Sequence, residues 1–345
     1  MQELAKTPRP AAVFDYALAG RFFSAHFPDA ETAHAADRHL SVLRASRLAN
    51  HDDIDPVSPS LRLFKGRWEI EAGLRPCFVS NEAGVEVSFY SSKDSYFVRL
   101  GDSTVAAGPG PHVMLALSEE LDSGSFLFER VLTYGLAAAL RRAGAFELHC
   151  AAVTDPATSV SALIVGPSGS GKSTLALQLA ESGWKFSSDD VVLLTVSDNL
   201  IEAFGLRNHF ALTDETMARS ELAGLDSVLS GRRVGTDNKL SLPPEDFFPN
   251  QHVAKCVPEL LIFAERREAP SSRFEELDQT QAMKRLLSMC PWTCLDLPMA
   301  QQFLDVLGRL SRQCRALVLY SGTDLLGDRQ YTTRFLSSIM KQQAA

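Results

Sequence analysis

One stretch of the sequence has residue types at the spacing needed to hold a phosphate group. It reads Gly166-Pro167-Ser168-Gly169-Ser170-Gly171-Lys172-Ser173-Thr174 and satisfies the pattern G-x-x-x-x-G-K-[ST] in full. Glycines let the backbone wrap so closely around a phosphate that its N–H groups donate to the oxygens. Lys172 supplies a positive charge to the β- and γ-phosphates, and the Ser173 hydroxyl can ligate Mg²⁺. The motif therefore predicts a nucleotide-binding P-loop.

A second group of catalytic residues is expected at Asp189 and Asp190, beyond the helix that follows the P-loop. Phosphoryl transfer needs carboxylates to complete Mg²⁺ coordination and to orient or deprotonate the attacking group. Because adjacent residues of an extended chain face opposite ways, one aspartate can serve the metal and the other the acceptor hydroxyl. The residues leave open which does which, and turn-forming aspartates that cap loop amides are the alternative.

His149 and Cys150 lie on the apolar stretch just before the P-loop strand. A histidine there can contact a phosphate or the acceptor, although a lone histidine on an apolar strand can also be a hydrogen-bonded core residue. The six cysteines are scattered, and their one close pair, Cys290 and Cys294, lacks partners at zinc-finger spacing. We therefore expect free thiols and a reducing, cytoplasmic location.

The elements that must position these groups can be read from the hydrophobic pattern. Apolar runs at 146–153, 163–165 and 191–196 predict buried strands, and 172–182 predicts the helix that leaves the P-loop. Strands that alternate with a helix indicate an α/β core. Before it, period-two alternation over 61–107 predicts a β-meander, and Gly108-Pro109-Gly110-Pro111 marks a boundary. We expect an N-terminal α+β accessory module at 1–109 and a P-loop domain at 110–345.

Composition excludes several classes of partner. The 345 residues include 34 Lys and Arg against 42 Asp and Glu, a net charge of −8, with 45% hydrophobic residues. An acidic chain without a dense basic block is a poor candidate for binding nucleic acid or an anionic membrane. No apolar run reaches the ~18 residues of a membrane span, and the N-terminus lacks a signal-peptide pattern. The sequence leaves open whether the chain forms a homo-oligomer.

Three segments together resemble a known family. Leu148–Val153, Leu163–Thr174 and Gly183–Asp190 carry a histidine, a P-loop and an Asp-Asp pair in the order and spacing of the HPr kinase/phosphorylase-like serine kinases. The resemblance implies a P-loop domain with a mixed sheet, similar to that of phosphoenolpyruvate carboxykinase. It also implies ATP-dependent transfer of the γ-phosphoryl group to a serine hydroxyl of a protein or peptide. Lys172 and Ser173 would then hold ATP–Mg²⁺, Asp189 and Asp190 would divide the base and metal roles, and His149 would line the phosphate site.

The chain also departs from that family. Thr174 stands where the bifunctional enzymes have glutamate, and Glu202–Asn208 matches their later signature only loosely. The expected acceptor is therefore a protein or peptide serine rather than HPr itself. Glu202 is a further candidate ligand of Mg²⁺ beside Ser173 and Asp190, and Arg207 is a second-tier candidate. Three basic residues of a loop-rich segment could close over the triphosphate or simply be solvated, namely Arg232, Arg233 and Lys239.

Three other functions compete with this interpretation. Leu229-Ser230-Gly231-Arg232-Arg233 hints at the signature of ABC-type ATPases but lacks its second glycine and its glutamine. A small-molecule kinase would carry an arginine-rich lid helix after the P-loop helix, and none is visible in the sequence. A non-catalytic nucleotide sensor would keep the P-loop and lose the transfer. The presence of both Asp189 and Asp190 favours a catalytic site.

Overall fold

The computed structural model describes residues 9–48, 58–206, 210–218, 220, 233–234 and 239–344. The chain divides into two compact units, each described here by itself: Met1–Phe146 with Pro291–Leu304, and Glu147–Cys290 with Asp305–Ala345. The sequence pattern had indicated a boundary at 109/110. The first unit continues past that point because helix α2 (Phe126–Arg142) packs against its strands β8 (Ser103–Ala107) and β9 (His112–Leu117).

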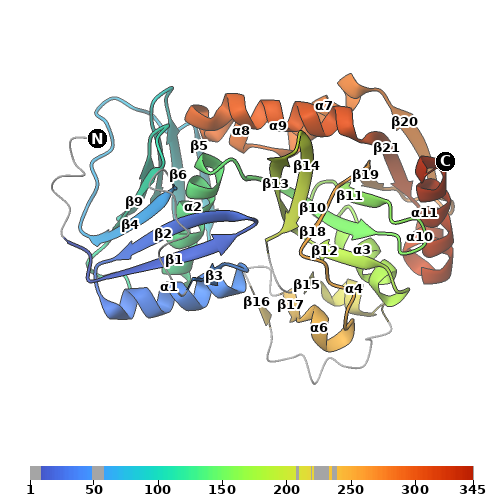
Figure 1. Ribbon diagram of the computed structural model, residues 1–345, viewed down its shortest axis with the longest axis horizontal. Helices are drawn as coiled ribbons and strands as arrows, with labels where there is room; N and C mark the ends of the chain where they lie inside the picture. The colour runs from blue at the N-terminus through green and yellow to red at the C-terminus, as the bar shows by residue number, and fades with distance from the viewer. Residues whose placement is uncertain are drawn as a thin grey trace. The chain divides into compact units, whose positions relative to one another are not determined.

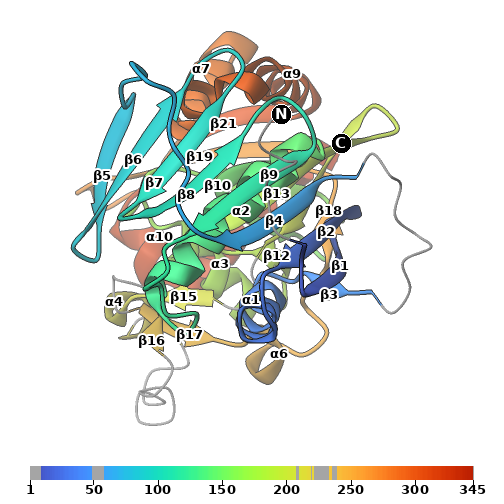
Figure 2. The same ribbon diagram turned by 90° about the vertical axis from the view of Figure 1, so that its left-hand side faces the viewer.

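The first unit is built on a nine-stranded sheet in the order β3-β1-β2-β4-β9-β8-β7-β6-β5 (Figure 2). Neighbouring strands are antiparallel, except that β4 runs parallel to both β2 and β9. Helix α2 and helix α1 cover one face. Of the meander expected over 61–107, the part from β5 onward is present as the consecutive antiparallel strands β5 to β9, whereas β4 pairs in parallel with β2 and β9. The bounds of the remaining elements are β1 Ala12–Leu18, β2 Arg21–Phe27, α1 Ala30–Val42, β3 Ser46–Arg47, β4 Ser60–Lys65, β5 Phe78–Glu82, β6 Val85–Ser91 and β7 Tyr96–Leu100.

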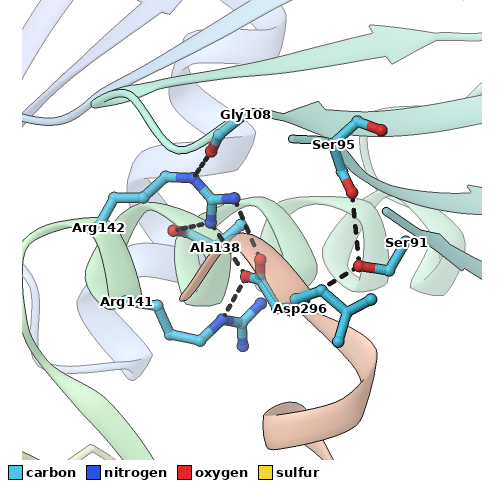
Figure 3. Close-up of polar contacts among 8 residues, drawn as sticks. Ser91, Ser95, Gly108, Ala138, Arg141, Arg142 and Asp296 are labelled. Atoms are coloured by element: carbon cyan, nitrogen blue, oxygen red, sulfur yellow. Dashed lines mark hydrogen bonds and ion pairs between the residues drawn. The ribbon is translucent and has the colours of Figure 1, made fainter. Parts of the chain in front are cut away.

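A buried carboxylate ties the distant segment Pro291–Leu304 to helix α2 (Figure 3). Asp296 accepts hydrogen bonds from Arg141 Nε at 2.8 Å and from Arg142 Nη1 and Nη2 at 3.0 and 3.2 Å. The three side chains are 0% exposed. The Arg141 guanidinium also lies 4.6 Å from the ring centre of Trp292, in helix α8 (Trp292–Leu295). One carboxylate thus accepts hydrogen bonds from two arginine side chains that have no access to water.

The second unit is built on another nine-stranded sheet, in the order β18-β14-β13-β10-β11-β19-β21-β20, with β12 paired to β10. Strands β11, β19 and β21 are parallel. Figure 1 shows helices α3 and α11 on one face of this sheet and α7 on the other. The bounds are β10 Phe146–Thr154, β11 Ser161–Val165, α3 Lys172–Glu181, β12 Lys185–Ser188, β13 Val191–Ser197, β14 Leu200–Gly205, β18 Lys255–Cys256, β19 Leu260–Arg266, β20 Arg273–Leu277, α7 Gln279–Met289, β21 Arg315–Ser321, α10 Thr323–Gly327 and α11 Arg329–Ala344. Helix η3 (Leu297–Met299) belongs to the first unit, and α9 (Ala300–Gln313) has residues in both units.

A small three-stranded sheet lies beside helix α3, in the order β15-β17-β16. Phe210, Leu212, Leu240 and Leu242 of this sheet belong to the same buried core as Leu175 and Leu179 of α3. The sequence had indicated a loop-rich segment here. The elements of this segment are β15 Phe210–Leu212, α4 Asp214–Ala218, β16 Arg233–Val234, β17 Lys239–Leu242 and α6 Pro244–Phe247.

The fold is therefore a mixed α/β fold with two large mixed sheets. The helix expected over 172–182 is present as α3. All six cysteines are free thiols, and burial raises the pKa of Cys150 well above its ordinary value. Among the described residues, no helix has the length and apolar character needed to cross a membrane.

Replacement of Asp296 by alanine should strongly destabilise the first unit. The substitution leaves Arg141 and Arg142 buried without their carboxylate, and breaking a buried ion pair in this way costs about 3–5 kcal/mol. Urea unfolding followed by circular dichroism measures the loss. The matched control is Asp102→Ala, whose exposed partner Arg67 lies 3.6 Å away, with the two side chains 65% and 77% exposed. An Asp296→Ala loss no larger than that of the control would contradict the assigned role.

Candidate functional site

A glycine-rich loop, residues 166–171, joins strand β11 to helix α3. Gly169 and Gly171 have φ values of 80° and 95°, a left-handed conformation that side chains disfavour. A Cβ at Gly166 would lie 2.7 Å from both the Ala264 carbonyl oxygen and Ser170 Oγ. The strand–loop–helix context expected for the phosphate-binding motif is present, and its three positions that need glycine have it.

The loop forms the floor of a cavity. Residues singled out by the sequence supply much of its lining, namely His149, Ser168, Gly169, Gly171, Lys172, Ser173, Thr174 and Asp190. The other residues of the lining are Ala211, Thr213, Glu215, Thr216 and Arg266. Four segments far apart in the chain, at 149, 190, 211–216 and 266, therefore meet at the cavity, besides the loop and the start of helix α3.

Lys172 is held close to the loop by its own backbone. Its Nζ donates to the carbonyl oxygens of Gly166 at 2.8 Å and Pro167 at 3.0 Å, and the residue is 5% exposed. Ser170 is buried as well. A buried ammonium is stabilised by such hydrogen bonds, since burial alone favours its neutral form. The charge of Lys172 is thus fixed at the point where the loop and helix α3 meet.

His149 and Asp190 are brought together by strand β10, which pairs with β11 and β12 besides its neighbour β13. It pairs with β11, with Cys150 opposite Val165, so His149 stands level with the start of the loop. It also pairs with β12, whose end leads directly to Asp190. The result is a contact of 3.0 Å between His149 Nδ1 and Asp190 Oδ1, with the side chains 42% and 21% exposed.

Asp189 points away from the cavity. Its Oδ2 accepts from the backbone N–H of Ala211 at 3.0 Å, and the residue is 2% exposed. Both aspartates lie in the bend between β12 and β13, and not in either strand. The structure places Asp190 in the lining of the cavity, whereas the Asp189 carboxylate holds strand β15 through its hydrogen bond with Ala211. The turn between them and β13 is held by Ser188 Oγ, which accepts from the N–H groups of Asp190 and Val191.

Glu202 is not brought to the cavity. It lies on β14 opposite Thr195 of β13, five residues beyond Asp190. At ~3.3 Å per residue this register separates Glu202 from Asp190 by roughly 16 Å. Its side chain instead pairs with Lys255 Nζ at 2.5 Å. Arg207 and Arg232 lie outside the described residues, as do the side chains of Arg233 and Lys239.

Sequence reasoning missed part of the cavity wall. Arg266 ends strand β19, the parallel neighbour of the P-loop strand, so a cation at the end of the apolar run 260–264 was a usable signal. Glu215 and Thr216 belong to the short helix α4, which Thr213 directly precedes and which has no hydrophobic periodicity to mark it. Thr174 connects helix α3 to helix α4, since its Oγ1 lies 3.0 Å from Thr216 Oγ1.

The donor set at the cavity suits Mg²⁺ bound together with phosphates. Among the described residues, no group of three or more His, Cys, Asp or Glu side chains is placed to hold a metal ion. Mg²⁺ in nucleotide sites takes one or two protein ligands and completes its octahedron with phosphate oxygens and water. Ser173 Oγ fits that requirement as a single protein ligand, whereas Glu202 is not part of the lining.

Replacement of Gly166 by alanine should abolish binding of nucleotide. The new Cβ would overlap a backbone carbonyl, so the loop must shift away from β19. We expect at least a ~10-fold loss of ATP affinity, measured by titration calorimetry with Mg²⁺, because a displaced loop misaligns several charge-assisted hydrogen bonds. Gly327→Ala is the control in the same unit, since its Cβ would meet open space. Unchanged binding in Gly166→Ala would show that the loop is not the phosphate site.

Comparisons with known proteins leave the family undetermined. No protein-family model matches the sequence, and no curated protein matches it. Among solved structures, the fold is similar to the Hpr(Ser) kinase/phosphatase from Coxiella burnetii, at 13% identity and a TM-score of 0.31. That alignment covers 57% of this chain and 98% of the Coxiella chain. A likeness at this level does not extend to the site, whose function must be argued from its own residues.

Proposed function

We propose that this protein is an ATP-dependent kinase that transfers the γ-phosphoryl group to a serine hydroxyl of a protein or peptide. The observation that carries the proposal is the meeting of His149, Lys172, Ser173 and Asp190 in one cavity at the mouth of the glycine-rich loop. These side chains come from strand β10, the start of helix α3 and the bend between β12 and β13, and the register of β10 with β11 and β12 explains why they converge.

The phosphate chain of ATP would lie along the loop. Backbone N–H groups of such a loop donate to phosphate oxygens, and the N-terminal end of helix α3 adds a favourable dipole. Lys172, at the first turn of α3, supplies a full positive charge at the same place. Mg²⁺, when bound with ATP at Ser173, would neutralise charge on the β- and γ-phosphates.

Asp190 is the proposed base for the acceptor hydroxyl. The hydroxyl oxygen forms the new bond to the γ-phosphorus, the bond to the ADP oxygen breaks, and the hydroxyl proton passes to the Asp190 carboxylate. His149 Nδ1 contacts Asp190 Oδ1 and orients that carboxylate. Because the transition state of phosphoryl transfer is loose, positioning of the hydroxyl contributes more than the strength of the base.

The kinase assignment predicts a separation between the two aspartates. Asp190→Asn should lower transfer of label from γ-labelled ATP to serine peptides by about 10²–10⁴-fold, since a general base contributes on that order. Lys172→Ala should lower it by at least ~10²-fold, because a fixed charge at the phosphates is lost. Asp190→Asn should keep its melting temperature, whereas Asp189→Asn should lower it, because the buried Asp189 carboxylate accepts from Ala211.

Lys185→Ala is the control for Lys172→Ala, because Lys185 is an exposed residue of the same unit. Transfer by Lys172→Ala at the wild-type rate would contradict the assignment. Binding of ATP without transfer to any serine peptide of a random library would instead favour a non-catalytic nucleotide sensor.

A further inference from the structure

Arg266 occupies a position at the cavity that no step above uses. It is the last residue of β19, the parallel neighbour of the strand that leads into the glycine-rich loop. The carbonyl of Ala264 lies against Gly166, and Arg266 is two residues further along. At ~3.3 Å per residue, its Cα stands roughly 7 Å beyond the start of the loop. A long side chain can span that distance to a bound phosphate group.

The alternation of β19 directs this arginine to the side of the loop and helix α3. Leu260, Ile262 and Ala264 share a buried core with α3, and side chains two residues apart in a strand lie on the same face. Arg266 continues that row and lines the cavity. Glu265 belongs to the opposite face, where it accepts from Arg285 of helix α7 at 2.7 Å.

The guanidinium of Arg266 is paired across the cavity with Glu215 of helix α4. Arg266 Nη2 lies 3.2 Å from Glu215 Oε1, and both residues line the cavity. The side chains are 49% and 56% exposed. An ion pair this exposed contributes little to stability, because water screens both charges. A phosphate group, with more charge and with oxygens spaced for two hydrogen bonds, is a stronger partner for a guanidinium.

The neighbouring Arg267 provides the contrast. Its Nη2 donates to Glu265 Oε2 at 2.8 Å, and its guanidinium lies 5.1 Å from the ring centre of Tyr320. Arg267 is therefore engaged away from the cavity, and it is not part of the lining. Two adjacent arginines of equal charge thus differ in whether they face the glycine-rich loop.

We propose that Arg266 binds the terminal phosphate of a nucleoside triphosphate, and that Glu215 is the counter-ion which that phosphate displaces. The inference rests on the proposed nucleotide site. It also accounts for selectivity between nucleotides, because Arg266 would contact the terminal phosphate that a triphosphate has and a diphosphate lacks. Lys172 and the loop, by contrast, hold the phosphates that both nucleotides share. Displacement of Glu215 leaves helix α4 attached to α3 through the Thr174–Thr216 contact.

Binding alone tests this proposal, without any need for an acceptor. Affinities for the non-hydrolysable triphosphate AMP-PNP and for ADP, each with Mg²⁺, are measured by titration calorimetry. Arg266→Ala should weaken AMP-PNP by about 10- to 100-fold, the value of a hydrogen bond between charged groups, and should change ADP by less than about 2-fold. Arg267→Ala, the matched control, should change neither nucleotide.

Glu215→Gln provides an independent arm with the opposite sign. It removes the competing carboxylate, so it should tighten AMP-PNP severalfold in the wild-type background and have no effect when combined with Arg266→Ala. Equal weakening of AMP-PNP and ADP by Arg266→Ala, or no weakening of either, overturns the proposal. So does a Glu215→Gln effect that persists without Arg266.

The failure of the proposed function would look different. Wild-type protein that binds neither nucleotide overturns the nucleotide site and this inference together. An Arg266-dependent preference for AMP-PNP in a protein that transfers no label overturns the kinase assignment and supports the role of Arg266. The two conclusions can therefore be judged separately.

Discussion

The close approach of Gly166 to the backbone of β19 is the constraint on which the rest of the site depends. Parallel strands β11 and β19 are hydrogen-bonded up to the point where the loop leaves the sheet, and a Cβ at Gly166 would meet the Ala264 carbonyl at 2.7 Å. The loop therefore turns immediately, before the sheet ends. Helix α3 then begins at Lys172, directly after the loop. The other groups that reach the cavity come from strand β10, the bend before β13, the segment 211–216 and the end of β19.

The electrostatics of the cavity follow from the charged groups of its lining. These are two cations, Lys172 and Arg266, and two carboxylates, Asp190 and Glu215, so the formal charge of the lining is balanced. Because the net charge of the lining is zero, a bound polyanion is held by the placement of Lys172 and Arg266 and not by an overall positive charge. The acidic surplus of the whole chain does not oppose this, because exposed charges more than ~10 Å apart are largely screened at ordinary ionic strength.

The parts of the site that sequence could predict are those in which chemistry and local geometry are adjacent in the chain. The glycines, Lys172 and Ser173 form one continuous motif, and Asp190 directly precedes the apolar run 191–196. The position of Glu202 could not be predicted, because it depends on the register of the β13–β14 hairpin. That register pairs Glu202 with Thr195, and the side chain contacts Lys255. Arg266 was missed because its proximity to the loop depends on the pairing of strands almost a hundred residues apart.

The first unit shows the same limit in a different form. Arg141 and Arg142 end an amphipathic helix, where cations are usually solvated and interact with the helix dipole. Here they are enclosed, because a segment some 150 residues later supplies Asp296. Likewise, β1 and β2 are joined at Ala19 and Gly20, both with positive φ, although the usual signal for such a turn is Asn-Gly or Asp-Gly. In each case the local pattern permits several structures, and a partner distant in sequence selects one. A long-range ion pair or strand pairing is therefore the level at which this fold is determined, and the same holds for the cation that faces the glycine-rich loop.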